Sequence, residues 1–137
     1  MVSIESLGYV EASTAIAAGM QAAQRFGRPM AFAVMDQAGD LIASARMDDV
    51  PARVLRQATR KAYTAAVMAT DTGSNGQKLK EQGRSISEMG DLQLTGMQGG
   101  LVIKRDGVIL GGIGVGGYNG GHLDEALAKI GLEVLMR

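Results

Sequence analysis

The dipeptide Asp106-Gly107 most restricts what this 137-residue chain can fold into. It separates two apolar runs, 101–104 and 108–116, and an Asp-Gly pair in that setting favours a two-residue β-hairpin turn. Two further runs, 30–35 and 41–46, flank a turn-forming segment at 36–40. Two consecutive hairpins predict an antiparallel sheet.

Helical apolar spacing appears in three segments, residues 4–26, about 51–69 and 123–136. Between the second and third, residues 71–98 are polar and rich in glycine. Because a structureless loop of that length is unusual in a compact domain, we expect short helices near 76–82 and 85–89 that form a flap or a partner contact. Helices packed on hairpins define the α+β class. No linker or repeat divides the chain, so one domain over 1–137 is expected.

Composition excludes several classes of protein. Basic and acidic residues number 14 each, which argues against a nucleic-acid binder. No apolar stretch approaches the roughly 20 residues of a membrane span, and the first residues do not resemble a secretory signal, so a cytoplasmic protein without a membrane partner is expected. The absence of cysteine removes disulfides and thiolate chemistry. Many glycines and few aromatics bury little area per residue, which predicts stabilisation by a homo-oligomer, dimer or higher.

The glycine-rich segment 111–117 contains G-x-G-x-x-G at Gly112, Gly114 and Gly117. A dinucleotide fingerprint also needs a second parallel strand and an acidic residue about 20 positions later, for which the chain has no room, so we reject nicotinamide binding. The bare strand instead predicts close approach by a ligand or a second subunit. Amides at the following helix start could also hold an anion.

The predicted helix from Pro51 is basic on its polar side, with no acidic residue before Thr70. Its cations are Arg53, Arg56, Arg60 and Lys61. One interpretation is a solvated face; the other is a site for a carboxylate or phosphate, with Arg46 added from the neighbouring strand. Lys61 adjoins small core residues, so a partly buried stem would suit it to an electrostatic anchor or a proton-transfer base.

His122 is the chain's single histidine and falls at the expected start of the last helix. The positive helix end favours a neutral ring, which can ligate a metal or accept a proton. One histidine cannot form a zinc site from protein ligands alone, but it suffices as an axial ligand of haem. A surface or capping role is the alternative.

Six sequence elements follow one another along nearly the whole chain: A-F-A-V-M-D (31–36), A-R-M-D-D (45–49), R-K-A-Y-T-A-A (60–66), Q-G-G-L-V-I (98–103), D-G-V-I-L-G-G-I-G-V-G-G (106–117) and the late pair Asp124-Glu125. Taken together, these motifs resemble the GlcG/HbpS-like haem-degrading domain family. The same family supplies the C-terminal domain of a propanediol-utilisation cobalamin adenosyltransferase. The resemblance implies an α+β fold with a five-stranded antiparallel sheet of profilin- or PAS-like kind, homo-oligomers, and links to haem binding, haem degradation, glycolate metabolism or corrinoid pathways.

The same resemblance implies a pocket between the sheet end and the helix from Pro51. The matched positions are Arg46, Asp48, Lys61 and Thr64 with Gly99, Gly100, Gly114 and Gly116, and Arg60 and Tyr118 complete the predicted ligand-binding set. Two positions depart from the family pattern. Gly116 replaces a family serine, and residues 4–26 lack the histidine that some haem-binding relatives carry on the first helix.

Three hypotheses follow. The first is an oligomeric protein that binds haem, another tetrapyrrole or a small anionic metabolite, with His122 as metal ligand only if haem is bound. The second is a metal-independent enzyme acting on an organic acid, with Lys61 or His122 as the catalytic proton-transfer group. The third is a structural accessory subunit.

Overall fold

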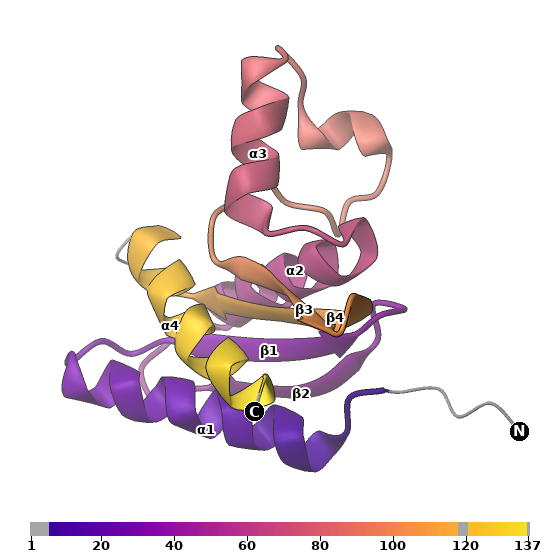
Figure 1. Ribbon diagram of the computed structural model, residues 1–137. Helices are drawn as coiled ribbons and strands as arrows, with labels where there is room; N and C mark the ends of the chain where they lie inside the picture. The colour runs from indigo at the N-terminus through magenta and orange to yellow at the C-terminus, as the bar shows by residue number, and fades with distance from the viewer. Residues whose placement is uncertain (1–5, 118–120, 137) are drawn as a thin grey trace, which may run out of the picture.

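The structure is a computed structural model that describes residues 6–117 and 121–136. Its fold is a four-stranded antiparallel sheet covered by helices on both faces (Figure 1). The strands β1 (Ala31–Asp36), β2 (Leu41–Arg46), β3 (Gly100–Arg105) and β4 (Val108–Gly116) stand in the order β2-β1-β4-β3. Helix α2 (Ala52–Met68) covers one face, and α1 (Tyr9–Arg25) and α4 (Gly121–Leu135) cover the other.

Both predicted hairpins are confirmed. Strand β2 has the expected bounds, and β1 is shifted by a single residue from the expected run. Asp106 and Gly107 both adopt positive φ, 50° and 79°, as a two-residue hairpin turn that follows the strand twist requires.

The expected five-stranded sheet is wrong: the part of the chain that the structure describes forms four strands. The apolar runs supply only two hairpins, and the long remaining segment cannot supply a strand because it is polar and glycine-rich. It forms α3 (Thr72–Glu81) and the short 3-10 helix η1 (Ile86–Met89), close to the two short helices expected there. In Figure 1 this segment stands out from the layered body as an arm.

Helix α1 begins later than the expected position 4, because Gly8 holds the extended conformation of an N-cap with φ −106° and ψ 166°. The Glu11 carboxylate accepts a hydrogen bond from the Gly8 N–H at 3.1 Å and so fixes the helix start. Residues 4 and 5, the first part of the expected helix, lie outside the described residues. Among the helices described, none is long and apolar enough to cross a membrane.

The main apolar core lies between the sheet and the α1–α4 layer. Phe32 and Val34 of β1 and Ile113 and Val115 of β4 point into it. The α2 face is built differently, since alanines on the helix meet alanines and glycines on the strands. Small side chains therefore bring α2 unusually close to the sheet.

Candidate functional site

Helix α2 packs directly against a stripe of glycines on β4. A Cβ added to Gly114 would lie 2.5 Å from the Ala62 nitrogen and would collide with the Ala58 carbonyl oxygen. Gly116 is likewise covered, since a Cβ there would lie 2.7 Å from the Val54 carbonyl oxygen. The sequence interpretation that a ligand or second subunit occupies this bare strand is therefore wrong. The chain's own helix occupies it, because the alanine face of α2 lets two backbones meet.

Lys61 is buried in a polar cluster at the end of the sheet where β3 begins and β4 ends. Its side chain is 1% exposed, and its Nζ donates to the Val115 carbonyl oxygen at 2.8 Å and to Asp124 Oδ2 at 2.8 Å. Asp124 belongs to α4, so the ion pair joins helices on opposite faces of the sheet. Gly99, at φ +127°, borders the cluster, and a Cβ there would lie 2.9 Å from Lys61 Nζ.

The second oxygen of the buried Asp124 has no hydrogen-bond partner among the described residues. Burial raises the pKa of this carboxyl, while the hydrogen bond and charge of Lys61 act in the opposite direction and only partly offset the effect. Lys61 Nζ is committed to two acceptors within the chain. This arrangement suits an electrostatic anchor better than a free proton-transfer base. Asp124 stood out in the sequence only as part of the family motif, because nothing local marks its partner.

Arg60 and Thr64 hold the chain as it returns from the arm. Arg60 Nη2 donates to the Leu94 carbonyl oxygen at 3.2 Å, and buried Thr64 Oγ1 accepts from the Thr95 N–H at 3.0 Å. Gly100 is similarly engaged, since its N–H donates to Thr72 Oγ1 at 2.9 Å. These three predicted site residues therefore lie beside Lys61 in the structure and make contacts within the chain.

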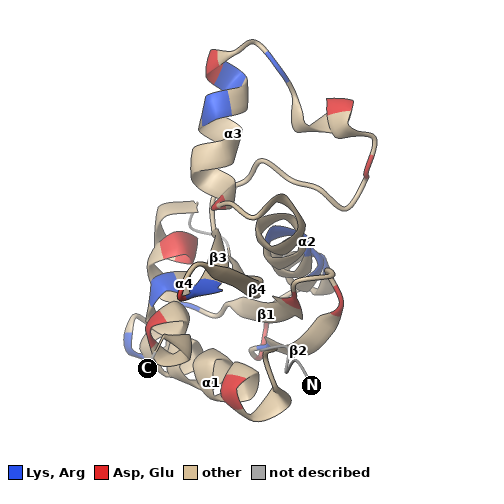
Figure 2. Ribbon diagram, turned by 45° about the vertical axis from the view of Figure 1, so that its right-hand side comes forward, with Lys and Arg blue, Asp and Glu red and all other residues tan. Residues whose placement is uncertain are grey.

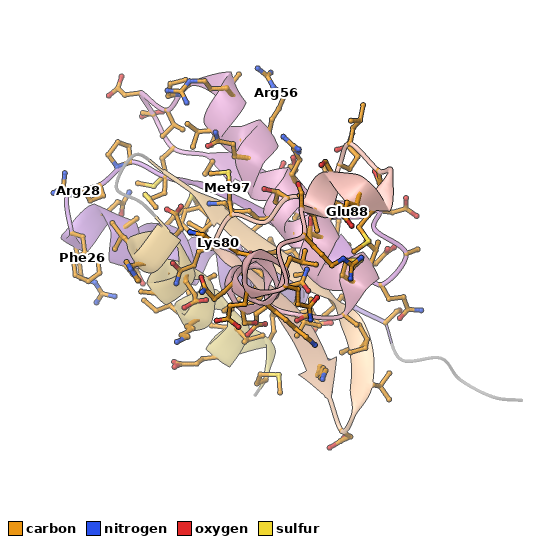
Figure 3. All side chains as sticks on the ribbon, turned by 90° about the horizontal axis from the view of Figure 1, so that it is seen from above. Phe26, Arg28, Arg56, Lys80, Glu88 and Met97 are labelled. Atoms are coloured by element: carbon orange, nitrogen blue, oxygen red, sulfur yellow. The ribbon has the colours of Figure 1, made fainter. Side chains whose placement is uncertain are left out.

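Tyr63, between them, anchors the same returning segment through a hydrogen bond of 2.6 Å from its hydroxyl to Asp91 Oδ2. That hydrogen bond raises the pKa of Tyr63 and lowers the pKa of Asp91. The outer side of α2 is basic and open: Arg53 and Arg56 are exposed, and Arg56 projects from the helix (Figures 2 and 3). The exposure of these two cations agrees with the interpretation that this side of the helix is a solvated face.

Arg46 and Asp48 do not join the Lys61 cluster. With Met47 they line a hollow of about 320 Å³ against α1, beside Met20 and Gln24. A second hollow, of about 540 Å³, shares Met20 and Gln24 and continues along α1. Its other lining residues are Thr14, Ala17, Ala18, Gln21 and Val134. We call the two hollows together the α1 groove.

Two further hollows border the arm. A polar one of about 540 Å³ lies beside α3 and contains Lys80 and Glu125 in its lining, and a smaller one of about 210 Å³ lies beside Arg60 and Leu94. No group of three metal-ligating side chains occurs in residues 6–117 and 121–136.

His122 lies exposed in the first turn of α4 and lines none of the hollows described above. Tyr118 lies outside the described residues. The predicted set is therefore distributed over three places: the Lys61 cluster, the α1 groove and the exposed start of α4.

Fold and surface together define a small α+β domain whose sheet is closed by helices on both faces and whose apolar hollow lies along an outer helix. The chain belongs to the family described as haem degrading protein HbpS-like, whose model matches residues 7–133. It is 36% identical over 104 residues to the protein GlcG of Escherichia coli K12, covering 76% of each chain.

Solved structures agree with this assignment. HbpS of Streptomyces reticuli, solved as a double mutant, superposes with a TM-score of 0.89 at 28% identity, covering 100% of this chain and 92% of the other. A PduOC:heme complex shares the fold with a TM-score of 0.85 at 22% identity, covering 95% of each chain.

Proposed function

We propose that this protein binds haem, or another flat anionic tetrapyrrole, in the α1 groove. The observation that carries the proposal is the groove itself, an apolar hollow along α1 that adjoins a hollow containing a guanidinium group. Membership of a family described as haem degrading, and the haem of the PduOC:heme complex that shares the fold, support the choice of ligand.

The side chains of the groove fit a flat ring with carboxylate substituents. Ala17 and Ala18 present little bulk, so a ring could lie close to the helix. Met20, shared by both hollows, offers a polarisable thioether to a ring face or to iron. Arg46 supplies charge-assisted hydrogen bonds to a carboxylate, while Asp48 in the same hollow would keep that carboxylate on the arginine side.

Titration with haemin followed by the Soret band tests the proposal. Ala17→Glu places a carboxylate in the groove at an exposed helical position, and Arg46→Gln removes the cation. We expect each to weaken binding by about 10-fold or more, the effect of losing a charged hydrogen bond of about 1.5–3 kcal/mol. Ala126→Glu, the same change at an exposed position of α4 outside the groove, is the matched control and should bind as the wild type does.

Two results would overturn the proposal: no Soret shift with the wild type, or equal binding by Ala17→Glu and Ala126→Glu. His122→Ala tests the separate prediction that His122 is an axial ligand. An unchanged spectrum in that variant would exclude His122 as the axial ligand. The α1 groove would remain the proposed binding site, with Met20 as the soft donor next to the ring.

The alternative enzyme, acting on an organic acid through Lys61 or His122, has less support. Lys61 Nζ already bonds two acceptors, and His122 lies apart from the hollows. A thermal-shift panel of haemin, cobalamins, flavins and small carboxylates separates the candidates. Stabilisation by small carboxylates alone would favour an anionic metabolite or an enzyme, and no stabilisation by any compound would favour an accessory subunit.

A further inference from the structure

The arm borders a hollow that the proposed haem site does not use. It lies where the segment after η1 returns to α2, and its volume is about 210 Å³. Ile86, Leu92 and Leu94 give it an apolar wall, while Arg60 and Asp91 add one positive and one negative charge. Pockets for drug-sized ligands have volumes of roughly 300–1,000 Å³, so this hollow suits a smaller molecule than a tetrapyrrole.

The guanidinium group of Arg60 is only partly satisfied by the protein. Its Nη2 donates to the Leu94 carbonyl oxygen at 3.2 Å, which fixes the orientation of the group. Its Nε–H group is buried and has no acceptor among the described residues, and Arg60 forms no ion pair with any of them. Because an unpaired buried donor is unfavourable, a carboxylate in the hollow would supply the acceptor that the chain does not.

Asp91 presents the opposite charge to the same hollow. Its Oδ2 accepts from the Tyr63 hydroxyl at 2.6 Å, and its Oδ1 accepts from the Gln93 N–H at 2.9 Å. The hydrogen bond from Tyr63 lowers the pKa of Asp91, so the carboxylate is charged at neutral pH. Because an ionised carboxylate has about four acceptor sites, Asp91 can still accept from an ammonium group.

Two opposite charges that line one hollow without pairing with each other favour a ligand that carries both. A fatty acid would satisfy Arg60 but would bring a second negative charge close to Asp91. An aliphatic amine would satisfy Asp91 and leave Arg60 without an anion. A zwitterion with an apolar side chain satisfies both charges and the apolar wall.

We propose that this hollow binds a free α-amino acid with an aliphatic side chain, such as leucine. The ligand carboxylate pairs with Arg60, the ammonium group pairs with Asp91, and the side chain packs against Ile86, Leu92 and Leu94. Leu92 is 90% exposed, so the ligand removes apolar surface of this residue from water. Both charged groups are already held by bonds within the chain, which lowers the cost of ordering them on binding.

An NMR titration of isotope-labelled protein with L-leucine, without haemin, tests the ligand class. We expect saturable shifts in residues 86–94. Isocaproate lacks the ammonium group, isoamylamine lacks the carboxylate and glycine lacks the side chain, so each should bind at least about 10-fold more weakly than L-leucine. No shift with L-leucine at roughly 10 mM, well above a millimolar Kd, overturns the proposal. Equal binding of isocaproate also overturns it, because that result would define a site for anions alone.

Variants test the position of the site. Arg60→Gln should bind L-leucine at least about 10-fold more weakly. Arg56→Gln is the matched control and should bind normally, since Arg56 is an exposed cation of the same helix that does not line the hollow. Leu92→Glu changes a residue with few contacts, so it keeps the fold and should also weaken binding, even where Arg60→Gln fails to fold. Equal binding by Arg60→Gln and Arg56→Gln, or by Leu92→Glu and wild type, overturns the placement.

The amino-acid site and the proposed haem site fail separately. Ala17→Glu alters the α1 groove and should bind L-leucine as the wild type does, because Ala17 does not line the hollow beside Arg60. Weaker binding of L-leucine by Ala17→Glu would place the amino acid in the α1 groove and overturn this assignment. Failure of haemin binding by the wild type leaves the expected L-leucine shifts unchanged.

Discussion

Replacing Lys61 by methionine tests directly how much the buried ion pair with Asp124 contributes to the stability of the fold. The change keeps an unbranched side chain in place and removes the ammonium group, which is bonded to Asp124 Oδ2 and to the Val115 carbonyl oxygen. Asp124, whose side chain is 4% exposed, then has no partner on either oxygen, because Oδ1 already lacks one. Breaking a buried ion pair from one side costs about 3–5 kcal/mol, a large part of the 5–15 kcal/mol that holds a typical domain together.

The cost should depend on pH with a defined sign. Burial already raises the pKa of Asp124 above its unfolded value, and Lys61 is the group that limits the rise. A group with a raised folded pKa favours the folded state at low pH and loses that contribution as pH rises through the folded pKa. Without Lys61 the pKa rises further, so the variant loses more stability relative to wild type at pH 8 than at pH 5.

Urea unfolding followed by circular dichroism, at fixed protein concentration, measures both effects. Lys104→Met is the matched control, since Lys104 is exposed on β3, and it should change stability by about 0.5 kcal/mol or less. Adding Asp124→Asn to Lys61→Met removes the stranded charge and should recover part of the loss at pH 8. The reasoning is refuted if Lys61→Met behaves as Lys104→Met does, or if its loss is the same at both pH values.

Three further predictions concern packing, hydrogen bonding and surface charge. Gly114→Ala should destabilise the protein by at least about 2 kcal/mol in urea, because its Cβ meets the α2 backbone, whereas Gly96→Ala, with ordinary contacts only, should stay within about 0.5 kcal/mol. Thr64→Val should cost about 1–3 kcal/mol by leaving a buried backbone N–H without its acceptor, and hydrogen exchange should rise in residues 91–95; unchanged exchange there would contradict this. Glu11→Gln should cost under about 1 kcal/mol at pH 7, because its pair with Arg105 is partly exposed, and the difference from wild type should vanish as pH falls through the lowered pKa of Glu11; a loss that persists at pH 2 would count against it.

Helix and strand positions were largely predictable because they depend on neighbours in the sequence. The Asp106-Gly107 turn sets the direction of β4 against β3 within a few residues, and the alternation of alanines with cations marks α2. The start of α1 was less predictable, because an extended glycine N-cap at Gly8 carries little local signal. The expectation of five strands came from the family resemblance and not from the residue pattern. It was wrong, because the described part of the chain forms four strands.

The candidate site depended far more on tertiary packing. Lys61 and Asp124 are 63 positions apart, and no spacing rule links them. Arg46 and Lys61 were expected in one pocket, yet Arg46 lines a hollow against α1 while the side chain of Lys61 extends from α2 to Asp124 of α4. Which face of a sheet a strand-end side chain reaches is decided by the twist of the strand and by the helix that covers it, and neither is encoded locally.

The sequence by itself determined the two hairpins, the three core-facing helices and the family, because turn chemistry and apolar periodicity are short-range properties. Tertiary structure alone decided that α2 packs on the glycine stripe, that the cation of Lys61 is buried against a carboxylate, and that the start of α3 covers the β3 edge of the sheet. These outcomes depend on which distant surfaces meet, where close packing and the cost of burying a charge leave few arrangements possible.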